Sequence, residues 1–185
     1  MLSRKIAIGS GVGIMLVGLL FMAGCYDTKT PLGSASSGTV DPANVGDFAI
    51  VPAADALPAP GAHPNIFIRN FDDKMYCISW TGDDGKTSLW AGYTTQVKDA
   101  MFANCRQLTD DGSLSDDFFI MRIAFSADHS QLTVRNLKDD FFKGQDVSSS
   151  DKLQSVIADN LDNNAMYDSD TLYAHRVAAT TQPAQ

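Results

Sequence analysis

Three cysteines carry most of the reactive chemistry in this sequence. Cys25 follows an apolar stretch near the N-terminus, and Cys77 and Cys105 lie in the body of the chain. A cysteine nucleophile needs a base beside it. The chain has three histidines, which are dispersed: His63, His129 and His175. A pairing of His175 with Cys77 or Cys105 would be accidental, and the sequence contains neither Gly-x-Ser-x-Gly nor His-Glu-x-x-His, so no catalytic residue is assigned.

The residues before Cys25 have the layout of an export signal. Arg4 and Lys5 give a basic start, an apolar stretch covers residues 6–21, and small residues precede the cysteine. The stretch of 16 residues is shorter than the roughly 20 residues that a membrane-spanning helix needs. We therefore expect residues 1–24 to be a leader that is removed.

The four residues Met22-Ala23-Gly24-Cys25 resemble the lipobox of bacterial lipoproteins, although Met22 replaces the commoner Leu. The resemblance implies cleavage after Gly24 and attachment of acyl chains such as palmitate to Cys25. Two or three chains hold a protein stably on a membrane, because each buried methylene contributes about 0.8 kcal/mol. In this family, Asp after the cysteine commonly retains the protein in the inner membrane, so Tyr26 implies the outer membrane, facing the periplasm.

The charge of the chain excludes some partners. The formal net charge is −8, and the loss of Arg4 and Lys5 with the leader makes it −10. A surface of that sign disfavours phosphate backbones, so we expect no nucleic-acid partner. The hydrophobic content of 44% is normal for a chain that buries one core.

Residues 25–64 are rich in Gly, Ser, Ala and Pro, and they predict a lipidated cysteine followed by a flexible tether. Such a composition buries too little apolar surface to offset the entropy of ordering. The apolar run at residues 48–51 interrupts this segment and is either part of the tether or an extra strand. Residues 178–185 predict a disordered tail.

Residues 65–177 predict a globular domain of the α+β class that is mainly antiparallel β. Alternating runs such as residues 75–80 and 118–125 indicate strands, and serines before residue 152 favour one helix over 152–160. We expect a meander sheet or a partly closed barrel of about six strands with one helix. This order of elements resembles small uncharacterised bacterial lipoprotein domains and, more distantly, a half-formed lipocalin-like barrel, and it transfers no site.

The positions of Cys77 and Cys105 on this meander bear on whether they form a disulfide. Their strands are separated by the strand at residues 87–95, so the two Cα atoms should be about 9 to 10 Å apart, whereas a disulfide needs about 7 Å or less. We expect two buried free thiols, and a disulfide is the alternative in an exported protein.

Four aromatic residues on two adjacent strands are the candidate ligand or partner surface: Tyr76, Trp80, Trp90 and Tyr93. The alternative is that they fill a β core. Paired aspartates fall at expected turns and lack the alternate spacing of a calcium loop. Residues 159–164 are either a source of oxygens for calcium or a helix end followed by a polar turn. We assign no metal ligand and no cofactor.

Together these features predict a membrane-anchored envelope lipoprotein. Its domain is expected to be a non-catalytic binding module for a partner protein or a small apolar ligand. The alternative is a periplasmic hydrolase with a site assembled from dispersed Asp and His residues. A cleft where His129 or His175 meets carboxylates would favour the enzyme, and an apolar groove without such groups would favour the binding module.

Overall fold

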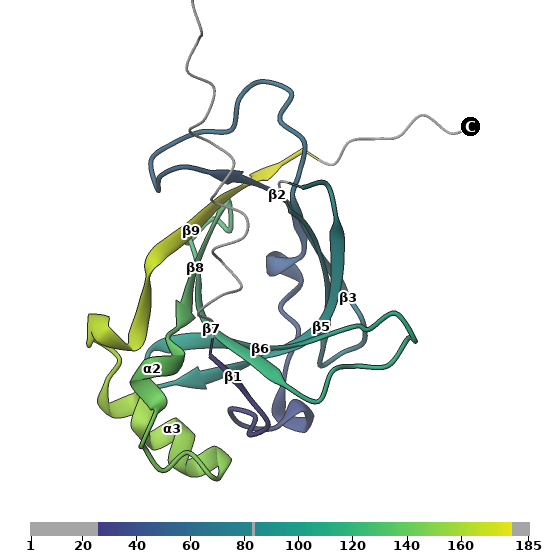
Figure 1. Ribbon diagram of the computed structural model, residues 1–185. Helices are drawn as coiled ribbons and strands as arrows, with labels where there is room; N and C mark the ends of the chain where they lie inside the picture. Colours follow the sequence, from purple (N-terminus) through teal and green to yellow (C-terminus); the bar gives the residue numbers. More distant parts are fainter. Residues whose placement is uncertain (1–25, 83, 179–185) are drawn as a thin grey trace, which may run out of the picture.

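The computed structural model describes residues 26–82 and 84–178. The expected leader, the lipidation of Cys25 and the tail from residue 179 lie outside the described residues. Eight strands form a closed antiparallel barrel in which each strand pairs with its neighbours in sequence and the last pairs with the first (Figure 1). They are β2 (Gly46–Val51), β3 (Ile66–Asn70), β4 (Tyr76–Thr81), β5 (Thr87–Val97), β6 (Ala100–Gln107), β7 (Phe118–Phe125), β8 (Gln131–Leu137) and β9 (Tyr167–Val177).

The mainly antiparallel β architecture is confirmed, but the expected number of about six strands and the partial closure are corrected. The barrel is closed, because β2 pairs with β9 and β7 pairs with β8. A ninth strand, β1 (Asp27–Thr28), lies beside the start of β7. Strand β2 contains the apolar run at residues 48–51, so of the two alternatives for that run the extra strand is correct.

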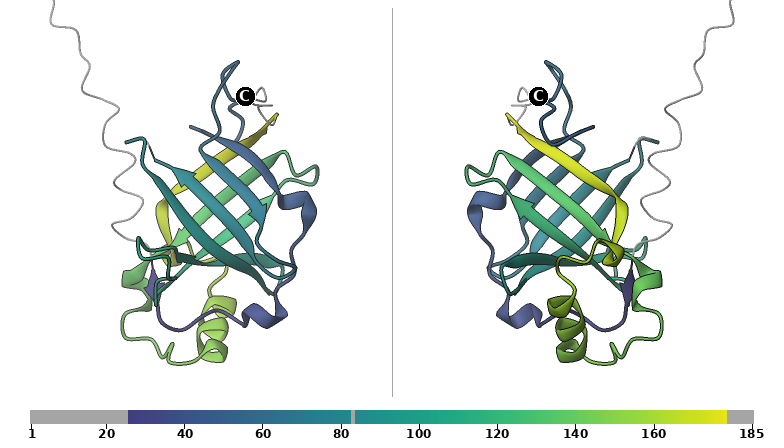
Figure 2. Two further views of the ribbon diagram at one scale, coloured as in Figure 1. Left: turned by 90° about the vertical axis from the view of Figure 1, so that its right-hand side faces the viewer. Right: turned by 90° about the vertical axis from the view of Figure 1, so that its left-hand side faces the viewer.

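Helices cover the outside of one part of the barrel wall (Figure 2). They are the short α2 (Asp139–Phe142) and the longer α3 (Ser150–Asp159), both in the connection between β8 and β9, followed by the 3₁₀ turn η3 (Asn164–Met166). The Ser149 side chain accepts a hydrogen bond from the Lys152 backbone N–H, which caps α3 as the sequence indicated.

Residues 26–45, here called the strap, run along the outside of the barrel and then across one of its ends to the start of β2 (Figure 2). They include β1 and two 3₁₀ turns, η1 (Ala35–Ser37) and η2 (Pro42–Asn44). The backbone N–H of Leu32 donates to Asn104 Oδ1 at 2.8 Å, and Thr95 Oγ1 donates to the Leu32 carbonyl at 2.7 Å. The expected flexible tether over residues 25–64 is therefore corrected for residues 26–51, which pack on the barrel or belong to it.

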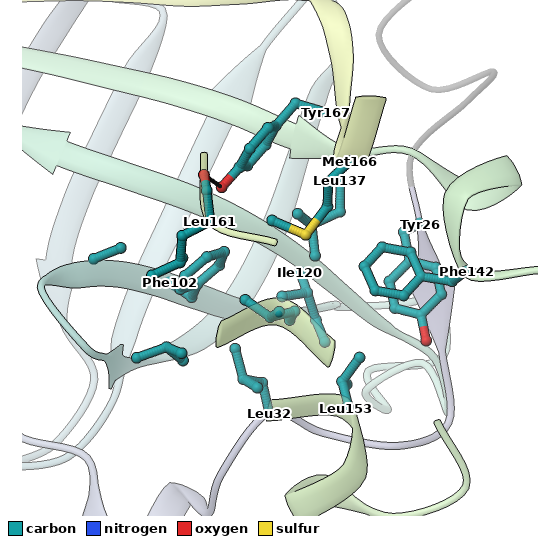
Figure 3. Close-up of a cluster of buried hydrophobic side chains, with 13 residues drawn as sticks. Tyr26, Leu32, Phe102, Ile120, Leu137, Phe142, Leu153, Leu161, Met166 and Tyr167 are labelled. Atoms are coloured by element: carbon teal, nitrogen blue, oxygen red, sulfur yellow. Dashed lines mark hydrogen bonds between the residues drawn. The ribbon is translucent and has the colours of Figure 1, made fainter. Parts of the chain in front are cut away.

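Two separate apolar clusters form the core. The outer cluster lies between the barrel wall, the strap and the helices (Figure 3), and it includes Tyr26, Leu32, Phe102, Ile120, Leu137, Phe142, Leu153, Leu161, Met166 and Tyr167. Within this cluster, the Tyr167 hydroxyl donates a hydrogen bond to the Leu161 carbonyl at 3.0 Å. The second cluster is formed by the opposite face of the sheet and lies inside the barrel. The interior, called the lumen below, is the candidate site.

Candidate functional site

The strand register fixes which side chains point into the lumen. Residues paired across neighbouring antiparallel strands share one face of a sheet. Phe102 and Ile120 face the helices, so the residues beside them in sequence face the lumen. Following the paired residues from β7 through β6 and β5 to β4 places Tyr76, Ile78 and Trp80 of β4 inside the barrel.

Three of the four candidate aromatic residues share this lumen and the fourth does not. Trp90 is paired with Ile78, so it also faces inward with Tyr76 and Trp80. Tyr93 faces outward and contacts the strap, where its hydroxyl donates to the Gly33 carbonyl at 3.4 Å. Burial raises the pKa of Tyr93 to about 12.

One end of the barrel is closed by a polar network, and we call it the closed end. The guanidinium of Arg176 lies over the Phe48 ring, 4.9 Å from its centroid. It donates to the carbonyls of Val45 at 2.5 Å, Ala43 at 2.6 Å and His129 at 3.0 Å. Arg176 therefore joins the end of the strap to the turn between β7 and β8.

A second contact at the closed end joins the same two segments. His129 Nδ1 lies 2.9 Å from Asn44 Oδ1, and the Asn44 side chain is buried. Gly46 makes room for this network, since a Cβ there would collide with the Arg176 guanidinium. The network seals the lumen with hydrogen bonds that the protein itself satisfies.

Large apolar side chains remain accessible at the other end, which we call the open end. The strands alternate in direction, so the connections that follow β2, β4, β6 and β8 all lie there. Trp80, Trp90, Phe119 and Met121 face the lumen and are partly exposed. The Trp90 and Phe119 rings meet edge to face, with centroids 5.0 Å apart. Water therefore reaches an apolar wall through this end.

A small cavity lies deeper in the lumen. Its volume is about 40 Å³, and its lining includes Ile68, Ile78, Ala103, Ile123 and Phe125. By volume it holds roughly three water-sized groups. Its accessible wall is apolar, so it suits the end of an apolar group better than a polar one.

The two remaining cysteines lie on opposite faces of the sheet, and both are free thiols. Cys105 is buried in the lumen, and desolvation raises its pKa to about 12, so the thiol is protonated at neutral pH. Cys77 faces outward and is only half-buried. Strand β5 separates their strands as expected, and the expectation that both are buried is correct for Cys105 alone.

The histidines do not assemble a catalytic group among the described residues. His175 is buried on the outer face of β9, and its Nε2 has no hydrogen-bond partner there. His63 is exposed in the connection between β2 and β3. Within residues 26–82 and 84–178, no ion pair joins a histidine to a carboxylate, and no three His, Cys, Asp or Glu side chains are grouped as a metal would need.

The acidic segments mostly satisfy their own turns. Asp111 Oδ1 accepts hydrogen bonds from Thr109 Oγ1 and Ser113 Oγ, and its pKa is lowered to about 2 by these contacts. In the stretch 159–164, Asn163 Oδ1 accepts from the Ala165 backbone N–H. These side chains act as turn caps.

The residues that close the barrel gave no sequence signal. Asn44, His129 and Arg176 come from distant segments, and only the fold brings them together. Phe119 and Met121 were visible as one face of the alternating run at residues 118–125, but their neighbour Trp90 could not be deduced from that run.

Comparisons with protein-family models, curated proteins and solved structures found no match. None of the helices within the described ranges combines the length and hydropathy needed to cross a bilayer.

Proposed function

We propose that this protein is a lipid-anchored envelope lipoprotein whose barrel is a non-catalytic binding module for a small apolar ligand. The ligand enters the lumen through the open end. One observation carries the proposal: large apolar side chains face the lumen and stay partly accessible at one end, while Arg176 seals the other.

The lumen favours an apolar group for energetic reasons. Trp80, Trp90 and Phe119 expose apolar surface to water, and covering such surface contributes roughly 25 cal/mol per Å². The deep cavity of about 40 Å³ is small beside the roughly 300 Å³ or more that encloses a drug-sized ligand. The ligand thus inserts a short apolar end and rests its larger part against the aromatic rings.

Polar lumen-facing residues supply contacts for the other part of the ligand. Gln107 is paired with Trp90, and Asn136 is paired with Met121, so both side chains share the lumen face. Both are partly exposed. An apolar wall with a few amide groups fixes the orientation of a ligand without catalysing a reaction.

Fluorescence titration tests the proposal directly, because the chain has 2 tryptophans and both lie in the lumen. The probe is N-phenyl-1-naphthylamine, with medium-chain fatty acids as competitors. We expect saturable energy transfer from tryptophan that the competitors reverse. Titration without saturation would contradict the proposal.

A matched pair of variants places the ligand. Ala103 lines the cavity, whereas Ala124 is exposed on the outer face of β7. Ala103→Val fills the cavity and should weaken binding about five-fold, equivalent to about 1 kcal/mol, while Ala124→Val should leave binding unchanged. Equal effects of the two variants would place the ligand elsewhere. Circular dichroism checks that both variants fold.

Mass spectrometry of the mature protein tests the anchoring. We expect an N-terminal peptide that begins at acylated Cys25, and release from the membrane in the Cys25→Ser variant. A mature chain that begins elsewhere would contradict this part of the proposal. No observation favours the alternative of a hydrolase, since neither His129 nor His175 pairs with a carboxylate in the described part of the chain.

A further inference from the structure

We infer that the open end of the barrel rests directly against the membrane surface, held there without a spacer. The partner of this end is a lipid surface with neutral headgroups. The inference rests on the proposed lipidation of Cys25 and goes beyond it, because it assigns the orientation of the domain and the surface that it contacts.

The first step is the position of β1 on the rim of the open end. Asp27 pairs with Phe119 and Thr28 with Phe118, the first two residues of β7. The Tyr26 backbone N–H donates to the carbonyl of Leu137, the last residue of β8, at 2.9 Å. Since β7 begins and β8 ends at the open end, β1 occupies the rim where β8 has stopped.

The second step is that this part of the strap is fixed. Tyr26 is 4% exposed, and its ring stacks on Phe142 with centroids 4.2 Å apart. Burial raises the pKa of the Tyr26 hydroxyl. Leu32 is fully buried and hydrogen-bonded to Asn104 and Thr95. Cys25 directly precedes Tyr26 in the sequence, so lipid on Cys25 would be attached one residue from the rim.

The third step is the apolar surface at the same end. Among the described residues, five large apolar side chains are exposed, and four of them belong to the open end: Ile50, Leu57, Leu89 and Leu108. Leu89 and Leu108 are neighbours, because the Leu108 backbone N–H donates to the Leu89 carbonyl at 2.8 Å. Side chains of this kind bind the interface between headgroups and acyl chains.

The charges at the open end select the type of lipid surface. Asp84, Asp110, Asp111 and Asp116 are exposed in the connections after β4 and β6, where the Lys86 ammonium group lies 3.4 Å from the Asp84 carboxylate and leaves the other three aspartates in excess. Lys29 lies at the rim, but its ammonium group is 3.4 Å from the Asp117 carboxylate. An acidic rim is repelled by anionic headgroups, so contact with zwitterionic phosphatidylcholine or phosphatidylethanolamine is favoured. The lumen then opens toward molecules dissolved in the bilayer, which deepens the proposed function.

Quenching of tryptophan fluorescence by spin-labelled lipid measures the contact. The lipidated full-length mature protein is reconstituted in phosphatidylcholine vesicles that carry a nitroxide on the headgroup. Trp80 and Trp90 face the lumen, with Trp90 at the open end, so we expect strong quenching. A variant with about 15 Gly and Ser residues inserted between Cys25 and Tyr26 gains roughly 20 Å of reach, and its quenching should fall about three-fold.

Equal quenching of the protein with and without the insertion, or no quenching of either, would overturn the inference. The insertion leaves residues 26–178 unchanged, so it does not depend on a core substitution. Leu32→Asp, which should release the strap, is a second variant expected to lower quenching in the same way. Replacing about a third of the lipid with phosphatidylglycerol should also lower the quenching of the protein without the insertion. A rise in quenching would contradict the neutral-headgroup assignment.

Mass spectrometry separates the two possible failures. If Cys25 carries no lipid, the proposed anchoring itself is wrong. If Cys25 is acylated and vesicle-bound but the tryptophans are not quenched, the anchoring stands and the orientation is wrong. The unlipidated Cys25→Ser protein, mixed with the same vesicles, gives the reference level without anchoring.

Discussion

The outer cluster and the lumen are both apolar, yet they differ in how completely they are covered. In the outer cluster, Leu32, Phe102 and Leu153 are fully excluded from water, because the strap and α3 cover the barrel wall. In the lumen, Trp90, Phe119 and Met121 stay partly accessible. Both faces belong to the same strands, so the contrast arises from what lies against each face.

This difference indicates that hydrogen bonding between the strands can close the barrel although side chains do not fill the lumen at its open end. Away from the open end, the lumen is filled by its own side chains, among them the fully buried Phe48 and Ala174. The lumen wall is held in place by closure of the hydrogen-bonded sheet and by Arg176 at one end. An apolar surface that the fold does not need to cover is available to a ligand.

The largest expected effect is on the outer cluster. Phe102→Ala removes a fully buried ring and should lower the free energy of unfolding by about 3 to 5 kcal/mol. Met121→Ala, in the partly exposed lumen wall, should cost about 2 kcal/mol or less, below the usual range for a buried Met. Urea denaturation monitored by circular dichroism gives both values, and similar losses would break the contrast between the two clusters.

A smaller effect is expected for the hydrogen bond that fixes the strap. Asn104 is 1% exposed and accepts from the Leu32 backbone N–H, so Asn104→Ala leaves that buried donor unpaired and should cost about 1 to 3 kcal/mol. Hydrogen exchange at residues 26–45 should rise more than exchange in β6. Asn136→Ala, on the lumen face, is the matched control, and faster strap exchange in that variant would contradict the interpretation.

The smallest expected effect compares the turns at the two ends. Asp128, near the closed end, accepts hydrogen bonds from the hydroxyls of Ser126 and Ser130, which lower its pKa to about 2. A depressed pKa stabilises the fold above the unfolded-state value of about 3.9, and this contribution is lost as the pH falls through about 2. Asp128→Asn should therefore lower Tm at pH 5 and flatten its fall between pH 4 and 2.

Asp111, at the open end, has the same kind of turn and the same direction of pKa shift. Both carboxylates are exposed, so each change in Tm should be small. Asp111→Asn should leave the contacts of Arg176 at the closed end unchanged. An increase of Tm at pH 5 in either variant would show that the turn hydrogen bonds are not stabilising.

The sequence predicted those features that depend on neighbours in the chain. Alternation at residues 75–80 and 118–125 indicated strands, and Ser149 indicated the start of α3. It did not predict closure, because alternation shows that a strand has two faces and does not show its partner. The strap was hidden for a similar reason, since Leu32 in a Gly-rich and Ser-rich segment is held by Asn104, which is 72 positions away.

For the candidate site, the sequence located the aromatic residues but not their faces. Trp90 and Tyr93 are separated by an odd number of positions on one strand, so their side chains point to opposite sides. That parity was available from the sequence and explains why Tyr93 lies under the strap while Trp90 lies in the lumen. The seal at the closed end depends on three segments and needed the structure.

The pairing of β2 with β9 has a consequence for how the chain reaches its native state. Ala49 pairs with His175, so the seam of the barrel joins the beginning of the domain to its end. A nascent or truncated chain that lacks β9 exposes two unpaired strand edges, which are templates for aggregation. Such distant contacts also slow folding. Chains truncated before β9 are therefore expected to associate more readily than the full-length chain.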